Sequence, residues 1–225
     1  MMTIDCKGEQ FILSKERAIF WLAKKMLVIS DLHIGKSAHF RRSGIQVPDT
    51  VGLTDLHRLT SLMKEFEPDT LLVTGDMFHN NINSDANAFV EWRRRYTHLN
   101  VVLIKGNHDA LKNEDYEALN IEVHPKELLC TPFRFIHDQP MEKDEYYNIC
   151  GHIHPGVVLQ GKAKQKLKFP CFYFGEHCAI LPAFSVFTGL KILKPQKSDQ
   201  FYALAGDKVI KVLSIFDEKR KNAGI

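Results

Sequence analysis

The first half of the chain alternates short apolar runs with longer segments whose apolar residues recur at helical spacing. The apolar runs, each five residues long and typical of buried strands, are residues 26–30, 70–74 and 101–105. Helical spacing links Leu59, Leu62, Met63 and Phe66, and again Phe89, Trp92 and Tyr96. This strand–helix–strand order predicts parallel strands joined by right-handed crossovers.

The second half is rich in strand-like runs and lacks long helical patterns. The runs read FRFIH, YYNIC, GVVLQ, KFPCFYF, CAILP, FYALA and KVIKVL, and AGDK at residues 205–208 is typical of a hairpin turn. We therefore expect two sheets packed face to face with helices outside. No internal repeat and no Pro/Gly/Ser-rich linker is present, so one domain over residues 1–225 is predicted.

Composition is that of an ordinary globular protein, with 44% apolar and 25% charged residues. The formal net charge of +3 is too small to indicate nucleic-acid binding by itself. No apolar run has the roughly 20 residues of a membrane helix, and no apolar signal region begins the chain. Five scattered cysteines fit reduced, buried thiols. A cytoplasmic protein without membrane association is expected.

Polar residues gather where the predicted strands end. Asp31 and His33 follow the first strand, Asp76 and His79 the second, and Asn107, His108 and Asp109 the third; His137, Asp138, His152 and His154 follow strands of the second half. Parallel strands bring their carboxyl ends to one rim, where ligands bind in open α/β sheets. One D-x-H is typical of a polar turn, but clusters at five strand ends indicate a metal site.

These candidate ligands are carboxylates, imidazoles and one amide, with no cysteine nearby. A structural zinc site usually contains thiolates, so this set favours a catalytic centre. Seven ligands suit two ions that share a bridging carboxylate. Mn²⁺ is our first expectation, and Fe, Zn and Co suit the same ligands. Water bound to such an ion loses its proton near neutral pH, which would let this centre hydrolyse a phosphate ester.

The order D-x-H, G-D, G-N-H-D, H, G-H-x-H between Asp31 and His154 resembles the calcineurin-like dimetal metallophosphoesterases. The resemblance implies an α+β fold, a four-layer αββα sandwich of two mixed sheets. It also implies a role for each residue. Asp31, His33 and His154 would hold one metal, and Asp76 would bridge. Asn107, His137 and His152 would hold the second metal. His108 would act at the leaving group, and Asp109 would orient His108. His79 would contact phosphate, or would be a histidine that only supports the core or the ligands.

A closer resemblance covers residues 30–48, 151–155, 169–172 and 181–189. These stretches are similar to the bacterial ligase-associated DNA damage response endonucleases, the PdeM family. The resemblance implies a phosphodiesterase encoded beside a DNA ligase and a helicase, with a role in DNA repair. The oligomeric state and the substrate stay open.

Basic residues lie close to these motifs. The candidate DNA contacts are Lys36, Arg41 and Arg42, and the alternating lysines Lys162, Lys164, Lys166 and Lys168. A one-sided row of lysines suits a nucleic-acid backbone, but edge-strand lysines that prevent aggregation give the same pattern. Arg93, Arg94 and Arg95 are expected on a solvated helix face.

Three functions are compatible with these features. The first is a DNA endonuclease, and the second is a phosphoesterase acting on a small molecule such as a cyclic nucleotide or a nucleotide-sugar pyrophosphate. The third is a metal-binding scaffold without activity, against which the complete ligand set argues. The family resemblance and the lysine row favour DNA.

Overall fold

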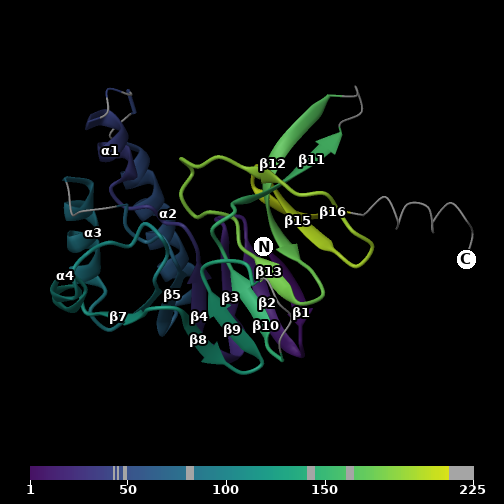
Figure 1. Ribbon diagram of the computed structural model, residues 1–225, viewed down its shortest axis with the longest axis horizontal. Coiled ribbons are helices and arrows are strands. Elements are labelled where there is room, and N and C mark those ends of the chain that lie inside the picture. The colour runs from purple at the N-terminus through teal and green to yellow at the C-terminus, as the bar shows by residue number, and fades with distance from the viewer. Residues whose placement is uncertain are drawn as a thin grey trace, which may run out of the picture.

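The computed structural model describes residues 1–42, 44, 46–47, 50–79, 84–140, 145–160 and 165–212, with only the backbone described at residues 39, 42, 50, 51, 84 and 85. Its first sheet has seven strands in sequence order, antiparallel from β1 to β4 and parallel from β4 to β7 (Figure 1). The strands are β1 Met2–Cys6, β2 Glu9–Ser14, β3 Ala18–Trp21, β4 Met26–Ile29, β5 Thr70–Thr74, β6 Asn100–Ile104 and β7 Ile121–His124.

The second sheet has nine strands and is also mixed. Its path runs β14-β11-β12-β13-β10-β9-β8, and β15 joins β12 and β16. The strands are β8 Glu127–Cys130, β9 Phe133–Ile136, β10 Tyr147–Cys150, β11 Pro155–Gln160, β12 Lys166–Phe174, β13 Cys178–Ile180, β14 Lys191–Ile192, β15 Gln200–Ala205 and β16 Lys208–Val212. The outer part of the β11–β12 hairpin extends away from both sheets (Figure 1).

Alternate residues of the parallel strands face two different cores. In β4, Leu27 and Ile29 pack in a cluster with the helices, whereas Val28 packs in a cluster with Phe135 and Phe172 of the second sheet. Because successive side chains of a strand point to opposite faces, a strand buried on both faces reads as a continuous apolar run. The apolar runs of the first half have this origin.

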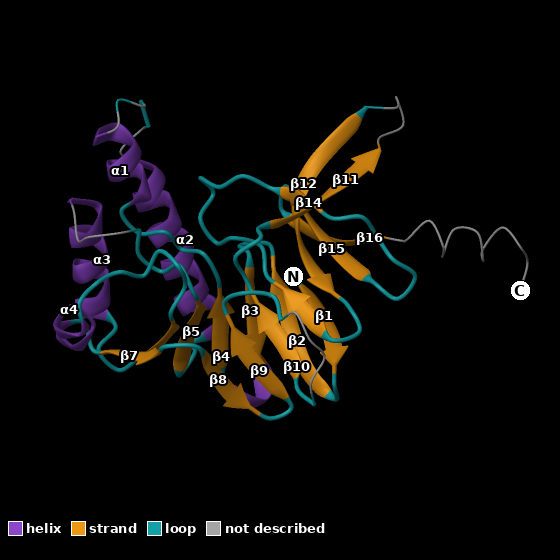
Figure 2. Ribbon diagram, in the orientation of Figure 1, coloured by secondary structure: helices purple, strands orange, loops and turns teal. Residues whose placement is uncertain are grey.

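The described residues also form four α-helices and the short 3-10 helix η1 (Leu22–Lys24) (Figure 2). They are α1 Lys36–Arg42, α2 Thr50–Phe66, α3 Ser84–Arg95 and α4 Asn113–Ala118. Apolar residues of α2, α3 and α4 pack with the strands of the first sheet. Among the described residues, no α-helix covers the outer face of the second sheet. The second helical layer of the expected αββα sandwich is therefore not seen in this part of the chain. None of these helices is long and apolar enough to span a membrane.

The structure confirms the predicted strands and the two mixed sheets, and it corrects two details. No element is predicted before Met26, yet β1, β2 and β3 form an antiparallel edge there. Arg93 is not on a solvated face, because its side chain is buried and donates to the carbonyl oxygens of Leu119, Leu99, Asn120 and Tyr96. Arg94 is exposed, as predicted.

Candidate metal centre

The loops after β4 and β5 stay hydrogen-bonded side by side beyond the sheet. Asp31 N–H donates to the Gly75 carbonyl oxygen at 3.1 Å, and His33 N–H donates to the Asp76 carbonyl oxygen at 2.9 Å. Left-handed backbone conformations occur at five predicted ligands, with φ of 54° at Asp31, 52° at His33, 50° at Asp76, 65° at His152 and 51° at His154. Such conformations are unfavourable for residues other than glycine and persist only where the surroundings enforce them. Here they turn the ligands of these loops toward one centre.

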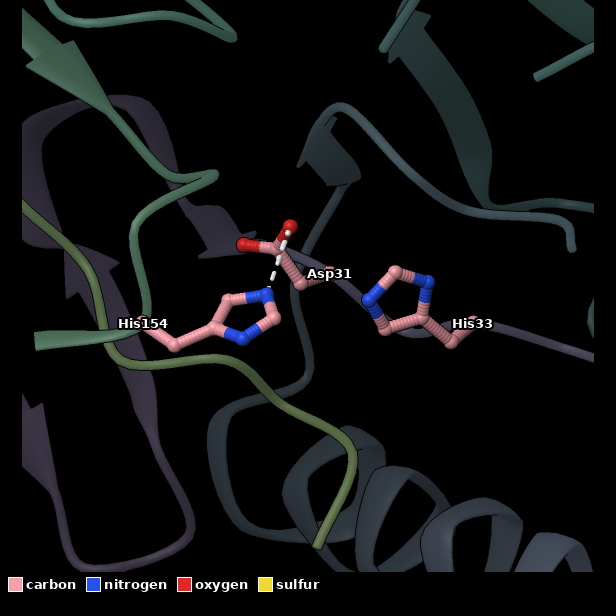
Figure 3. A group of neighbouring side chains, drawn as sticks. All are labelled: Asp31, His33 and His154. Atoms are coloured by element: carbon pink, nitrogen blue, oxygen red, sulfur yellow. Dashed lines mark ion pairs between the residues drawn. The ribbon is translucent and has the colours of Figure 1, made fainter. Parts of the chain in front are cut away.

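The first group of potential ligands is Asp31, His33 and His154, whose ligand atoms lie within 4.8 Å of one another (Figure 3). His154 Nε2 is 3.3 Å from Asp31 Oδ1. Asp31 and His33 are buried, and among the described residues neither Asp31 Oδ1 nor either ring nitrogen of His33 has a hydrogen-bond partner. Unpaired buried polar atoms cost roughly 1–3 kcal/mol each, and a divalent cation offers a partner to the carboxylate and to one ring nitrogen at once. The side chains therefore fit a metal ion.

Their protonation states fit the same conclusion. Burial lowers the pKa of His33 to about 2, so its ring is neutral and its lone pair is free to coordinate. Burial alone would raise the pKa of Asp31, but the His154 ring and the Ser30 hydroxyl hold that pKa below its ordinary value. Asp31 and His33 thus offer a carboxylate and a neutral imidazole at neutral pH.

The second group is Asp76, His137 and His152, whose ligand atoms also lie within 4.8 Å of one another. His137 Nε2 is 3.6 Å from Asp76 Oδ1, 3.1 Å from His152 Nδ1 and 3.2 Å from Asn107 Oδ1. His137 Nδ1 lies 3.0 Å from the Thr74 carbonyl oxygen, an acceptor that directs Nε2 toward the centre. Asn107 therefore belongs to this group, and all seven predicted ligands converge in two adjacent sets.

Glycines keep the loops close to these ligands. A Cβ atom on Gly106 would lie 2.2 Å from Asp76 Oδ1. On Gly151 it would lie 1.6 Å from Ser30 Oγ and 2.7 Å from Asp31 Oδ2. Neither position has room for a side chain, which explains the glycine in the G-N and G-H motifs.

His108 and His79 lie beside the first group rather than inside either group. The His108 ring centroid is 5.6 Å from that of His33 and 4.7 Å from that of His79. The backbone N–H of His108 donates a hydrogen bond to Asp76 Oδ1 at 2.9 Å. His108 is half-buried and His79 is buried. This placement suits groups that act on a substrate held at the centre.

Asp109 requires a correction. Its carboxylate accepts hydrogen bonds from Phe78 N–H at 2.8 Å and Gly106 N–H at 2.9 Å. Among the described residues, Asp109 makes no hydrogen bond to the His108 ring. The expected hydrogen bond that would orient this ring is therefore not formed. Asp109 instead ties the loop after β5 to the loop after β6.

The basic candidates are only partly described. Lys36 is half-buried at the start of α1; burial lowers its pKa, which the nearby Asp31 and Asp76 carboxylates oppose. Arg41 Nη1 lies 3.5 Å from the Val47 carbonyl oxygen. Lys166 and Lys168 are exposed on β12, in the projecting hairpin. Arg42 has only its backbone described, and Lys162 and Lys164 lie outside the described residues.

Sequence reasoning missed the structural role of the loop at residues 181–189. Phe184 N–H donates to the Ser30 carbonyl oxygen at 2.7 Å, and Ser185 N–H donates to that of Asp31 at 3.1 Å. The loop therefore braces the first ligand from the second half of the chain. The LPAFSVFTG stretch carries the family resemblance, but nothing local in it indicates this contact.

Comparison with known proteins agrees with this geometry. The family model described as calcineurin-like phosphoesterase matches residues 24–216, which include every candidate ligand. The chain belongs to the calcineurin-like phosphoesterase family. It is therefore a metal-dependent phosphoesterase of a family that uses dimetal centres, and its two ligand sets provide the residues for one.

Among solved structures, this chain is similar to a nuclease. It is 30% identical to the Pseudomonas putida nuclease MPE, with a TM-score of 0.80, covering 94% of this chain and 99% of that one. The E. coli phosphoesterase Yfce is 16% identical, with a TM-score of 0.44, covering 83% and 97%. The Aquifex aeolicus protein AQ665, of unknown function, is 19% identical, with a TM-score of 0.41, covering 57% and 78%. No curated protein matches the sequence.

Proposed function

We propose that this phosphoesterase is a DNA endonuclease that hydrolyses phosphodiester bonds with two divalent metal ions. The observation that carries the proposal is the similarity, over nearly the full length of both chains, to a protein described as a nuclease. The convergence of all seven candidate ligands supports it, because a partial set would not hold two ions.

The metals would supply positive charge to the phosphate and an activated water molecule as nucleophile. The protein's own residues supply position and protons. Asp31, His33 and His154 would hold one ion, and Asp76, Asn107, His137 and His152 would hold the other, with Asp76 shared. Asn107 is a neutral ligand, so it adds no negative charge to repel a phosphate. His108 would donate a proton to the departing alkoxide. His79, buried against His108, would contact a phosphate oxygen.

The experiment compares four substrates under one set of conditions. Metal-free protein is reloaded separately with Mn²⁺, Fe²⁺, Zn²⁺ and Co²⁺ and assayed on plasmid, single-stranded DNA, a cyclic nucleotide and a nucleotide-sugar pyrophosphate. We expect DNA to be cut internally and Mn²⁺ to support the highest rate. Turnover of a small molecule with no cleavage of DNA would reject the nuclease function and favour the alternative substrate class.

We further propose, on the sequence resemblance alone, that this activity serves DNA repair together with a DNA ligase and a helicase. A nuclease that supplies such a pathway should leave ends that the ligase can join, directly or after processing. Adding purified ligase to the cleavage products and measuring resealing on a denaturing gel tests this role.

A further inference from the structure

A half-buried aromatic side chain, Phe187, lies beside the first ligand group. It lines a small recess together with His33, Lys36, Ser37, Asp55 and Ser185. The recess has a volume of about 20 Å³, which is room for about one water molecule, so no base can enter it. A base held against this part of the centre has to lie outside the recess, and Phe187, which is only half-buried, keeps part of its side chain accessible there.

The loop that carries Phe187 is fixed by partly buried polar contacts. Arg58 donates to the Phe184 carbonyl oxygen at 2.8 Å, and Arg17 donates to that of Ser185 at 2.8 Å. Asp55 accepts from Val186 N–H at 3.3 Å and pairs with Arg58 at 2.9 Å. Contacts of this kind hold a loop in one conformation before any ligand binds. Phe187 is therefore presented from a rigid support.

Phe187 has an aromatic neighbour on α1. The rings of Phe40 and Phe187 are 5.4 Å apart at an interplanar angle of 87°. Lys36, one helical turn before Phe40, supplies a positive charge close to the ligands. A nucleotide combines a flat aromatic base with a phosphate. It therefore matches an aromatic side chain and a cation that lie together beside a centre that hydrolyses phosphate esters.

We propose that Phe187 stacks on the nucleobase next to the scissile phosphate and so selects single-stranded DNA in which that base is unpaired. This inference rests on the proposed nuclease function and adds a residue that determines specificity. Stacking on an aromatic ring tolerates every base, because each base has a π-face. The residue would therefore give affinity for single strands without a sequence preference.

The test measures two inhibition constants against hydrolysis of bis(p-nitrophenyl) phosphate by the Mn²⁺-loaded protein. One competitor is a thymidine oligonucleotide, and the other is an abasic oligonucleotide of equal length, which keeps the phosphates but has no bases. The wild type should bind the thymidine strand more tightly. Phe187→Ala should reduce that preference by roughly 5- to 100-fold, from the energy of base–aromatic stacking, and Phe187→Trp should retain it.

Phe66 provides the matched control. It is also half-buried and pairs with one phenylalanine, Phe20, at 4.7 Å, but it ends α2 at the edge of the sheet opposite the metal centre. Phe66→Ala should leave the preference unchanged. An unchanged preference in Phe187→Ala, or equal inhibition of the wild type by both strands, would overturn the stacking role alone. Failure of both strands to inhibit would overturn the proposed nuclease function, and the stacking role with it.

Discussion

The Asp109 carboxylate joins two ligand-bearing loops by accepting a hydrogen bond from the Phe78 N–H at 2.8 Å. Its other oxygen accepts from Gly106 N–H, in the loop that carries Asn107. Phe78 lies two residues after Asp76. One buried side chain therefore links the loop of the bridging candidate Asp76 to the loop of Asn107, a candidate ligand of the second metal.

Replacing Asp109 with Asn should destabilise this link. The new amide would present N–H groups to a site that contains two N–H donors, which leaves one buried donor unpaired at a cost of roughly 1–3 kcal/mol. Urea denaturation measures the change in the free energy of unfolding, and metal analysis should show weaker retention of the second ion. Asp5→Asn, on the exposed side of β1, is the control and should change stability by less than about 0.5 kcal/mol. Full stability and metal content in Asp109→Asn would contradict the structural role.

Asp76→Asn should remove the carboxylate that we propose to be shared by the two ions, while leaving the fold largely intact. Asp76 is buried, and its Oδ1 lies 3.6 Å from His137 Nε2. Loss of its negative charge weakens the attraction for both cations, so bound metal should fall below two ions per chain and diester cleavage should be abolished. Elemental analysis and a cleavage assay on the same preparation check this. Two ions and normal activity in the variant would exclude a bridging role.

The first-half residues at the centre were predictable from sequence because each comes shortly after an apolar run that is buried on both faces. β4, β5 and β6 are continuous apolar segments, and parallel strands place the loops at their carboxyl ends on one rim. The N-terminal edge was not predictable in this way. In β1 exposed and partly buried residues alternate, a weak pattern that becomes a strand only through pairing with β2.

Other features depend on contacts between residues far apart in sequence. Arg93 follows the pattern of a solvated helix face, but carbonyl oxygens 26 and 27 residues later accept its hydrogen bonds. Asp109 lies next to His108 in sequence, yet its partner Phe78 is 31 residues away. The loop that carries Phe187 is held by Arg17 and Arg58, more than 120 residues earlier. Local patterns contain no information about such partners.

Gly151→Ala should release metal from the first ligand group. The added Cβ would lie 2.7 Å from Asp31 Oδ2 and 1.6 Å from Ser30 Oγ, so Asp31 has to move from its place beside His154. Isothermal titration of the metal-free protein should show one binding event weakened more than the other. Gly189→Ala is the control, because no atom lies within 4 Å of its Cβ position and its φ is not positive. Equal metal affinity in the two variants would refute the packing argument.

His108→Asn should slow catalysis without loss of metal. The His108 ring lies beside both His33 and His79, where a leaving group could receive its proton. An ester with a poor alkoxide leaving group should lose roughly 10²- to 10⁴-fold in rate. An activated aryl ester should lose much less, because its leaving group departs without a proton. Equal losses on both esters, or loss of a metal ion, would count against this role.

The exposed lysines of the β11–β12 hairpin should set the salt dependence of DNA binding. The hairpin begins directly after the candidate ligand His154, and Lys166 and Lys168, two residues apart, share one face of β12. Each phosphate contact on a single strand contributes about −0.7 to the slope of log affinity against log salt. Replacing Lys166 and Lys168 with Ser should flatten that slope by about 1.4 if each makes one contact. Adding Lys162→Ser and Lys164→Ser should flatten it further, to a total of about 2.8 for four contacts.

The control for this charge change is Lys24→Ser with Lys64→Ser. Both lysines are exposed at the edge of the first sheet opposite the metal centre, since Lys24 precedes β4 and Lys64 lies in the last turn of α2. This pair removes the same two charges and should leave the slope near that of the wild type, because a small change in net charge acts weakly over long distances in salt. If the hairpin variant kept the wild-type slope but lost solubility, its lysines would protect a projecting strand from aggregation instead of contacting DNA.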